Sequence, residues 1–377
     1  MDFTFTEEQQ AAVEAARAVF AGVAPDGVPS PSLTAGAVAE DFDRPLWRRL
    51  ADAGLLSLLL DAEYGGAGLD PVALCLVLRE SAKVLARVPL LESTAALVAV
   101  QAHGGPELKA DVLARAGRGE LVLTVAASGR TGHDSAELAV SARQDGDVWV
   151  LDGLQTAVPW AHNADHVVVP AHTAAGPTVL ALVPRVHQGV VLAEQLSTTG
   201  ERLGELRLDS ARIAARDVID ADGAWERLRE LLTTGTCALA LGLGEGVLRM
   251  TSAYTSTREQ FGFPVATFQA VAMQAADRYI DLRAMEATLW QAAWRISTGA
   301  GGALPAAADV AVAKTWASEG VRRVVQTAQH LHGGFGADVE YPLHRYHAWA
   351  KQLELSLGPA AAHEEALGDL LAAHPLG

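Results

Sequence analysis

The periodicity of apolar residues changes twice along the chain, and the order of these changes is the strongest constraint on its fold. Helical spacing extends to about Gly117, short β-rich runs follow from Glu120 to about Asp220, and helical spacing returns at Trp225. Helices, then strands, then helices, with no βαβ alternation, predict an α+β protein without a parallel dinucleotide-binding sheet. The expected domains are an N-terminal helical domain over 1–118, an all-β domain over 119–220 and a C-terminal helical domain over 221–377.

Capping and breaking residues mark the boundaries of individual helices. Thr6 to Gln9 form a capping box that starts the first helix. No proline interrupts Trp225 to Thr257, which predicts a helix of roughly 50 Å at about 1.5 Å per residue. A second long helix is expected from Phe268 to Ile296, and Pro305 begins a third that runs to His332. We expect one last amphipathic stretch from Leu343 to Leu371.

Composition and charge narrow the location and the partners. The formal charge of −16 and the pI near 5.1 argue against nucleic acid or an anionic membrane surface as a partner. No run of eighteen apolar residues and no signal-peptide core is present, so a cytoplasmic location is expected. Cys75 and Cys237 lie in apolar helical stretches, where buried thiols are expected rather than a disulfide or a metal pair.

Two local patterns resemble ligand-binding motifs but lack the context that such motifs require. GLGEG at Gly242 to Gly246 resembles a nucleotide loop, but it lies within a helix and follows no strand, so its glycines are expected to let helices pack closely. His330 with His332 and His344 with His347 lack the helical i, i+4 spacing of a hydrolytic metal site, so no metal is expected.

The last third of the chain carries three motifs in a fixed order. REQFGFPVATFQ runs from Arg258 to Gln269, and HLHGGFG and VEYPLHR follow some sixty residues later. With YGGAG near Tyr64 and the order of the domains, this pattern resembles the acyl-CoA dehydrogenases, which desaturate acyl thioesters between the α and β carbons. The resemblance implies a middle β-barrel or sandwich, a C-terminal four-helix bundle and FAD as cofactor.

The resemblance assigns the first motif to the cofactor. The arginine at Arg258 would meet the flavin pyrophosphate, which suits the rigid donor fork of a guanidinium. Phe261 and Gln269 occupy positions that touch the adenine end of FAD. From the residues alone, a surface arginine, a core phenylalanine and a capping glutamine stay open as readings.

The glycine motif is assigned to the same cofactor. Gly333 and Gly334 match glycines against which the pyrophosphate packs across a subunit interface, so the resemblance implies an oligomer. His330 stands where the family usually has glutamine. A plain helix-ending glycine pair is the alternative.

The middle domain departs from the family. The family's Thr-Glu-Pro and Gly-Ser-Asp run is replaced by TVAASGRTGHDS, in which only Thr124 and Ser128 match the pattern. Trp160 occupies the segment that lies beside the flavin ring in the family, and a core tryptophan is an equal alternative.

The catalytic base is missing from both places where the resemblance expects it. Those positions are Leu357, before Gly358, and Leu232 on the long helix, and leucine cannot abstract a proton. Glu245 is the remaining candidate, because burial in an apolar helix would raise its pKa. Alternatively, Glu245 faces solvent and pairs with Arg249 at i+4.

The C-terminal pattern is similar to a subgroup of actinobacterial dehydrogenases that includes heteromeric assemblies and enzymes of sterol-type CoA thioesters. Three hypotheses follow: an acyl-CoA dehydrogenase that passes electrons to an electron-transferring flavoprotein, alone or in a homo- or heterotetramer; a catalytically silent subunit that completes a FAD site with a paralogue; and another flavin reaction or a biosynthetic dehydrogenation on the same fold.

Overall fold

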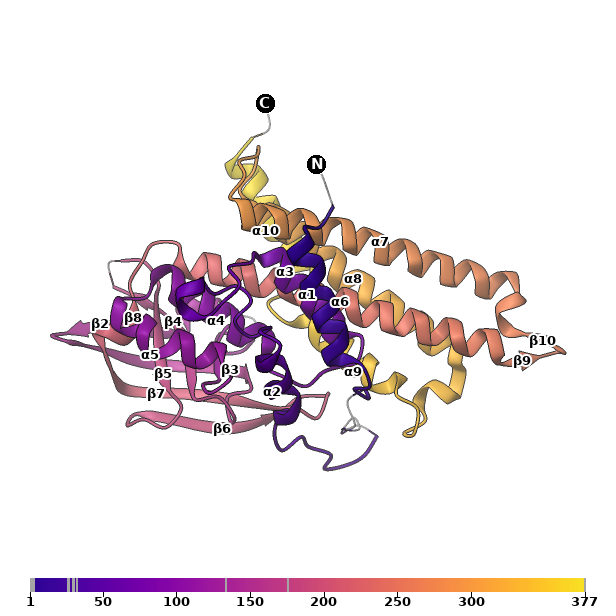
Figure 1. Ribbon diagram of the computed structural model, residues 1–377, viewed down its shortest axis with the longest axis horizontal. Coiled ribbons are helices and arrows are strands. Elements are labelled where there is room, and N and C mark those ends of the chain that lie inside the picture. Colours follow the sequence, from indigo (N-terminus) through magenta and orange to yellow (C-terminus); the bar gives the residue numbers. More distant parts are fainter. Residues whose placement is uncertain are drawn as a thin grey trace.

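The computed structural model places a β domain beside a long helical bundle, with the N-terminal helices packed where the two meet (Figure 1). The structure describes residues 4–25, 28, 31, 33–132, 134–174 and 176–375. Helices, strands and helices follow one another as predicted, and the fold is α+β.

The N-terminal part is helical up to Gly117. Its elements are α1 (Glu7–Phe20), α2 (Arg44–Asp52), η1 (Ala62–Tyr64), α3 (Pro71–Ala82), α4 (Leu90–His103) and α5 (Pro106–Gly117). The predicted capping box is confirmed, because the Gln9 amide donates to the Thr6 hydroxyl over 3.2 Å and the Thr6 amide donates to the Gln9 side chain over 3.0 Å. Gln9 also donates to Asp70, the N-cap of α3, which ties α1 to α3.

The middle part forms one twisted sheet around its own apolar core. Its elements are β1 (Leu123–Val125), η2 (Ala136–Leu138), β2 (Val140–Asp145), β3 (Val148–Pro159), β4 (His166–Thr173), β5 (Val179–Pro184), β6 (Val190–Leu196), β7 (Arg202–Ala214), η3 (Ala215–Asp217) and β8 (Val218–Ile219). In the described residues the order is β6-β7-β3-β2-β4-β5-β8, with β1 on β4. Most pairs are antiparallel, so this is not a doubly wound dinucleotide-binding sheet.

The C-terminal part consists of long helices. Its elements are α6 (Ala224–Thr257), β9 (Glu259–Gln260), β10 (Phe263–Pro264), η4 (Val265–Thr267), α7 (Gln269–Thr298), α8 (Ala306–His332), η5 (Gly333–Ala337), α9 (Leu343–Leu355) and α10 (Ala360–Ala373). The expected single stretch from Leu343 to Leu371 is wrong, because it is two helices. Leu357 and Gly358 adopt φ values of 60° and 99°, and Pro359 follows, so the first helix cannot continue.

The glycines of α6 allow close helix packing, as predicted. A Cβ on Gly242 would lie 2.0 Å from the Arg79 carbonyl oxygen of α3, and one on Gly246 would lie 3.0 Å from the Lys83 carbonyl oxygen. By length and composition α6 could cross a membrane, but 83% of its most apolar window is buried inside the protein, as in the core helix of a soluble fold.

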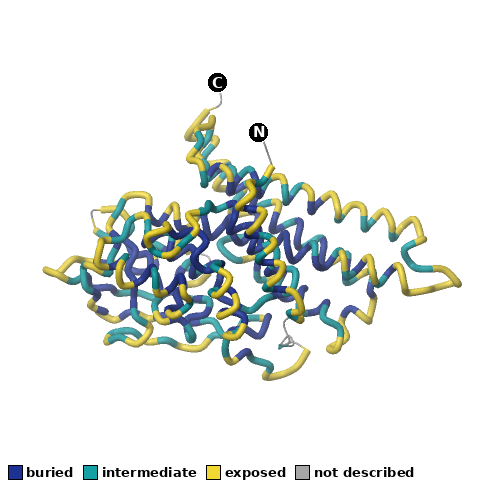
Figure 2. The backbone as a smooth tube through the Cα atoms, viewed as in Figure 1, coloured by how far each residue is buried: buried dark blue, intermediate teal, exposed yellow. Residues whose placement is uncertain are grey.

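Burial differs sharply between neighbouring long helices. The middle of α6 is buried, whereas the β9–β10 hairpin and the N-terminal half of α7, up to Ile280, are largely exposed (Figure 2). We call the exposed apolar side chains on this hairpin and on α7 the outer face: Phe261, Phe263, Phe268, Met273, Tyr279, Ile280 and Trp294.

Candidate functional site

The cofactor motifs gather at the far end of the helical bundle, which we call the tip (residues 258–269 and 330–337). Arg258 caps the C-terminus of α6 and is exposed. Among the described residues its guanidinium has no ion-pair or side-chain hydrogen-bond partner. Phe261 and Gly262 have positive φ and form the hairpin turn, which leaves Phe261 90% exposed. Gln269 begins α7 and is also exposed.

An aromatic cluster fixes the glycine turn beside the end of α6. His332 and Phe335 stack on Tyr254, at ring-centroid distances of 4.3 and 5.4 Å. The His332 Nδ1–H donates to the Ala328 carbonyl, and Nε2 accepts from the Tyr341 hydroxyl over 3.0 Å. His332 is therefore a structural residue rather than a metal ligand.

The turn that this cluster supports is open to solvent. Gly333 has a φ of 60°, and no atom lies within 4 Å of a Cβ built on Gly333 or Gly334. His330 is exposed on the preceding turn of α8. The tip thus presents a cation, an aromatic ring and an uncovered backbone.

A separate cavity of about 1330 Å³ lies between the β domain and the helices. Both positions at which the family resemblance implies a base, Leu232 on α6 and Leu357 between α9 and α10, line this one cavity. None of the predicted tip residues does. The chain's own cavity therefore lacks a carboxylate at both of these positions.

Strained backbone surrounds this cavity. Leu85, Ala157, Trp160 and Leu357 all have positive φ, between 48° and 60°, and all four line it. Such conformations are costly for residues with a side chain and concentrate at ligand sites. The cavity wall is therefore held in shape by its surroundings.

Trp160 closes one side of the cavity. Its indole Nε1 donates to Glu92 Oε2 over 3.2 Å, and its ring meets Phe42 edge to face. Thr124 is fully buried and donates to the Pro159 carbonyl over 2.6 Å. Thr124 thus fastens β1 beside Trp160 without itself lining the cavity, whereas Ser128 does line it.

The other end of the cavity is held by polar contacts. Gln352 of α9 accepts from Ser197 and Thr199, which joins α9 to the loop between β6 and β7. Near Leu357, the His363 Nε2–H donates to the Leu357 carbonyl over 2.9 Å. Burial lowers the pKa of His363 to about 4, so its ring is neutral.

Glu245 lies outside this cavity, and the expectation for its pKa is wrong. Its carboxylate pairs with Arg79 of α3, and Lys83 Nζ lies 3.4 Å from it. Burial would raise its pKa, but these two cations outweigh burial and lower it. The partner expected in the alternative, Arg249, is replaced by Arg79. Glu245 is therefore an ionised bridge between α3 and α6, unsuited to act as a base.

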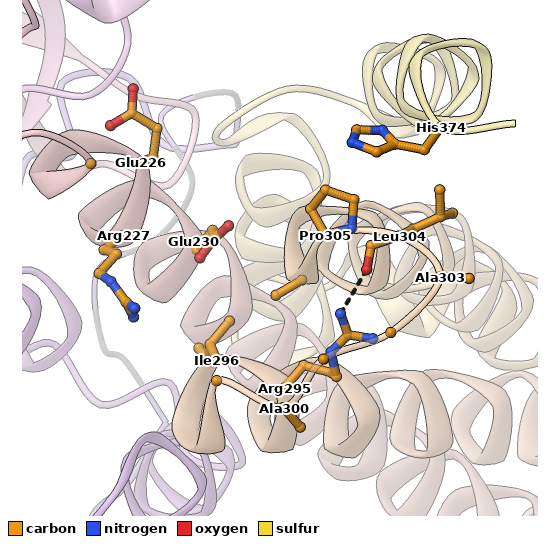
Figure 3. Close-up of a pocket in the computed structure, with 15 residues that line it drawn as sticks. Glu226, Arg227, Glu230, Arg295, Ile296, Ala300, Ala303, Leu304, Pro305 and His374 are labelled. Atoms are coloured by element: carbon orange, nitrogen blue, oxygen red, sulfur yellow. Dashed lines mark hydrogen bonds between the residues drawn. The ribbon is translucent and has the colours of Figure 1, made fainter.

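A second, shallower hollow of about 540 Å³ lies at the opposite end of the bundle from the tip (Figure 3). Glu226 and Glu230 of α6 line one side, and His374 lies across from them. Arg295 is occupied, because it donates to the Leu304 carbonyl over 2.7 Å and pairs with Asp309 over 3.0 Å. Arg227 of α6 lines the same hollow as a second cation.

Comparison with known proteins identifies the class. The acyl-CoA dehydrogenase N-terminal domain matches residues 6–120, and the C-terminal domain of the same family matches residues 230–371. Acyl-CoA dehydrogenase FadE27 of Mycobacterium tuberculosis is 41% identical over 342 residues, covering 89% of this chain and 90% of that protein. The chain belongs to the acyl-CoA dehydrogenase family, whose enzymes are FAD-dependent oxidoreductases acting on CH–CH bonds of acyl-CoA.

Two solved structures are similar over nearly the whole chain. The ChsE4–ChsE5 complex from Mycobacterium tuberculosis is 36% identical with a TM-score of 0.91, covering all of both chains. The Tcur3481–Tcur3483 steroid acyl-CoA dehydrogenase variant is 38% identical with a TM-score of 0.88, covering 97% of this chain and 98% of that one.

The residues of the tip fit the diphosphate half of FAD. Arg258 is an exposed cation without a partner among the described residues, and a guanidinium suits a diphosphate. The open Gly333–Gly334 backbone allows close approach of a ligand. In the part of the chain that the structure describes, Arg258, Phe261 and Gln269 of the tip stay exposed.

Sequence reasoning missed Glu92. It is the only charged residue in the run LLESTAALVAV of α4, in which most residues are buried. A single carboxyl in a helix that is apolar all round is the signal that could have found it.

Proposed function

We propose that this chain is one subunit of a heteromeric FAD-dependent acyl-CoA dehydrogenase, and that its tip completes a flavin site whose ring half lies in a paralogous partner. One observation carries this proposal. The motif residues that match the family are exposed at the tip, whereas the chain's own cavity has leucine at both expected base positions.

The chemistry explains why the FAD contacts and the catalytic base can lie in different subunits. Desaturation requires a base for the α proton, and bound FAD accepts hydride from the β carbon. In this chain Arg258 would hold the diphosphate, Phe261 and Gln269 would contact the adenine end, and His330, Gly333 and Gly334 would line the remaining surface. None of these roles needs a base, so the tip can serve a partner that supplies one.

The outer face supports an assembly. Phe261, Met273 and Ile280 are 90%, 60% and 64% exposed on the hairpin and on α7. Contiguous exposed apolar side chains mark protein interfaces. The solved ChsE4–ChsE5 relative is a complex of two different chains, which favours a paralogue as the partner.

The substrate and the electron acceptor follow from the class. An acyl-CoA thioester is the substrate, and the steroid enzyme among the similar structures favours a sterol-type acyl group in lipid metabolism. An electron-transferring flavoprotein would reoxidise the FAD, and we place the assembly in the cytoplasm.

The proposal is tested by co-expressing the chain with a paralogous subunit and measuring bound FAD. Arg258→Ala in this chain should weaken FAD retention by roughly 10- to 100-fold, because charge-assisted hydrogen bonds are lost. Arg212→Ala, which removes an exposed arginine of β7, is the matched control and should retain FAD. Full FAD retention by the Arg258 variant would refute the role of the tip.

A further inference from the structure

Glu92 is one of the carboxyl groups that line the cavity. Its Oε2 accepts from the Trp160 indole over 3.2 Å, but no cation among the described residues pairs with it. Glu201 pairs with Arg87 on the cavity rim, whereas Glu137, like Glu92, accepts from an indole, that of Trp225, over 3.1 Å.

Apolar residues line the cavity around Glu92. Leu90, Leu91 and Val125 line the same cavity. Burial raises the pKa of Glu92 to about 7, although the side chain is only half-buried by surface area. The accessible part of the side chain lies at the cavity wall.

We propose that Glu92 is the polar anchor of a ligand site in this chain's own cavity, which takes a bulky apolar molecule carrying a hydroxyl or carbonyl oxygen. The Trp160 indole donates to one carboxyl oxygen, and Glu92 lines the cavity. A protonated carboxyl donates to a carbonyl, and an ionised one accepts from a hydroxyl. This proposal rests on the proposed function, because a flavin bound in this chain's own cavity would occupy the same space.

The anchor predicts a specific kind of selectivity. A ligand without an oxygen would shield the carboxyl from water without giving it a new hydrogen bond, which costs free energy. A ligand that supplies the hydrogen bond avoids this cost. The volume of about 1330 Å³ admits a molecule much larger than a short acyl chain.

Two probes of matched shape test this selectivity. We would titrate the purified protein, in whatever assembly it forms, with 2-naphthol and with 2-methylnaphthalene and measure affinity by calorimetry. The probes differ only in a hydroxyl in place of a methyl group. We expect 2-naphthol to bind roughly tenfold more tightly, the value of one hydrogen bond to a carboxyl group. Equal affinity for the two probes in the unmodified protein would overturn the proposal.

Two variants assign the preference to Glu92. Glu92→Gln keeps a polar group beside Trp160 and should retain most of the preference. Glu92→Leu removes every polar atom and should abolish it. A preference that persists unchanged in Glu92→Leu would overturn the proposal. Should Glu92→Leu fail to fold, the unmodified protein still provides a test. Equal affinity of the unmodified protein for the two probes would overturn the proposal.

Discussion

The tip and the cavity of this chain show opposite patterns. The tip matches the family motifs but has its residues exposed, with Phe261 90% accessible and Arg258 without a partner in the described part of the chain. The cavity lies between the β domain and the helices and has strained backbone in its wall, but it carries Leu232 and Leu357 where a base is expected. The difference supports our proposal that cofactor contact and proton abstraction are separable functions located in different subunits.

The largest expected effect comes from a substitution on the outer face. Ile280→Asp on α7 should prevent assembly with the paralogue, because an unpaired carboxylate in an apolar interface costs several kcal/mol. Analytical ultracentrifugation measures the loss. Val186→Asp is the control, since Val186 is 80% exposed on the β domain, away from the outer face. An intact assembly with Ile280→Asp would show that α7 is not the interface.

The cavity wall near Leu357 depends on a buried lysine. Lys314 of α8 is fully buried and donates to Ser318 Oγ and to the carbonyls of Leu353 and Glu354, which end α9 just before Leu357. Lys314→Met should cost about 3 kcal/mol, because two buried carbonyls lose their donor. Urea unfolding measures this cost.

An exposed lysine on the same helix pair provides the control. Lys351→Met removes a half-exposed partner of Glu354 and should change stability by less than about 0.5 kcal/mol. Similar losses for the two variants would mean that the hydrogen bonds of Lys314 do not hold the cavity wall.

The bridge at Glu245 sharpens the distinction between structure and catalysis. Its pKa is lowered in the folded state, so its stabilisation is present above the ordinary pKa of 4.5 and is lost as the pH falls through the lower folded value. Glu245→Gln should cost about 1–2 kcal/mol at pH 7 and less at pH 4 by urea unfolding.

A surface carboxylate of similar chemistry serves as the comparison. Glu319→Gln, in a more exposed pair with Arg322, should have almost no effect on stability. Loss of turnover in the Glu245→Gln assembly without loss of stability would restore Glu245 as a base.

The last prediction concerns how the protonation of Glu92 changes the stability of the protein with pH. Its folded pKa of about 7 exceeds the ordinary 4.5, so folding keeps a proton that the unfolded chain releases, and stability falls as the pH rises between these values. Glu92→Gln does not titrate. Its stability relative to the unmodified protein should therefore rise by about 2.5 kcal/mol from pH 5 to pH 8. A difference that does not change with pH would place the carboxyl in contact with bulk water.

Much of the fold could be predicted from local signals. The capping box at Thr6, the uninterrupted helix through Thr257 and the close-packing glycines at Gly242 and Gly246 all depend on neighbours in sequence or on one helix face. The break at Leu357 was missed, because a leucine with positive φ is set by tertiary contacts and not by its own preference.

The site was harder to predict because it depends on contacts distant in sequence. The pairing of Glu245 with Arg79 joins residues 166 apart, and it reversed the expected direction of the pKa. Glu92 meets Trp160 across 68 residues. Motifs gave the residues of the tip, but their exposure, which decides how they can be used, became visible only in three dimensions.

The FAD content of the purified assembly tests the central claim most directly. The account predicts a colourless protein when this chain is purified alone, and one FAD for each pair of this chain with its paralogue. FAD at one per chain, or a yellow protein from this chain alone that an acyl-CoA bleaches without oxygen, would contradict the claim and show that this chain's own cavity is a complete flavin site.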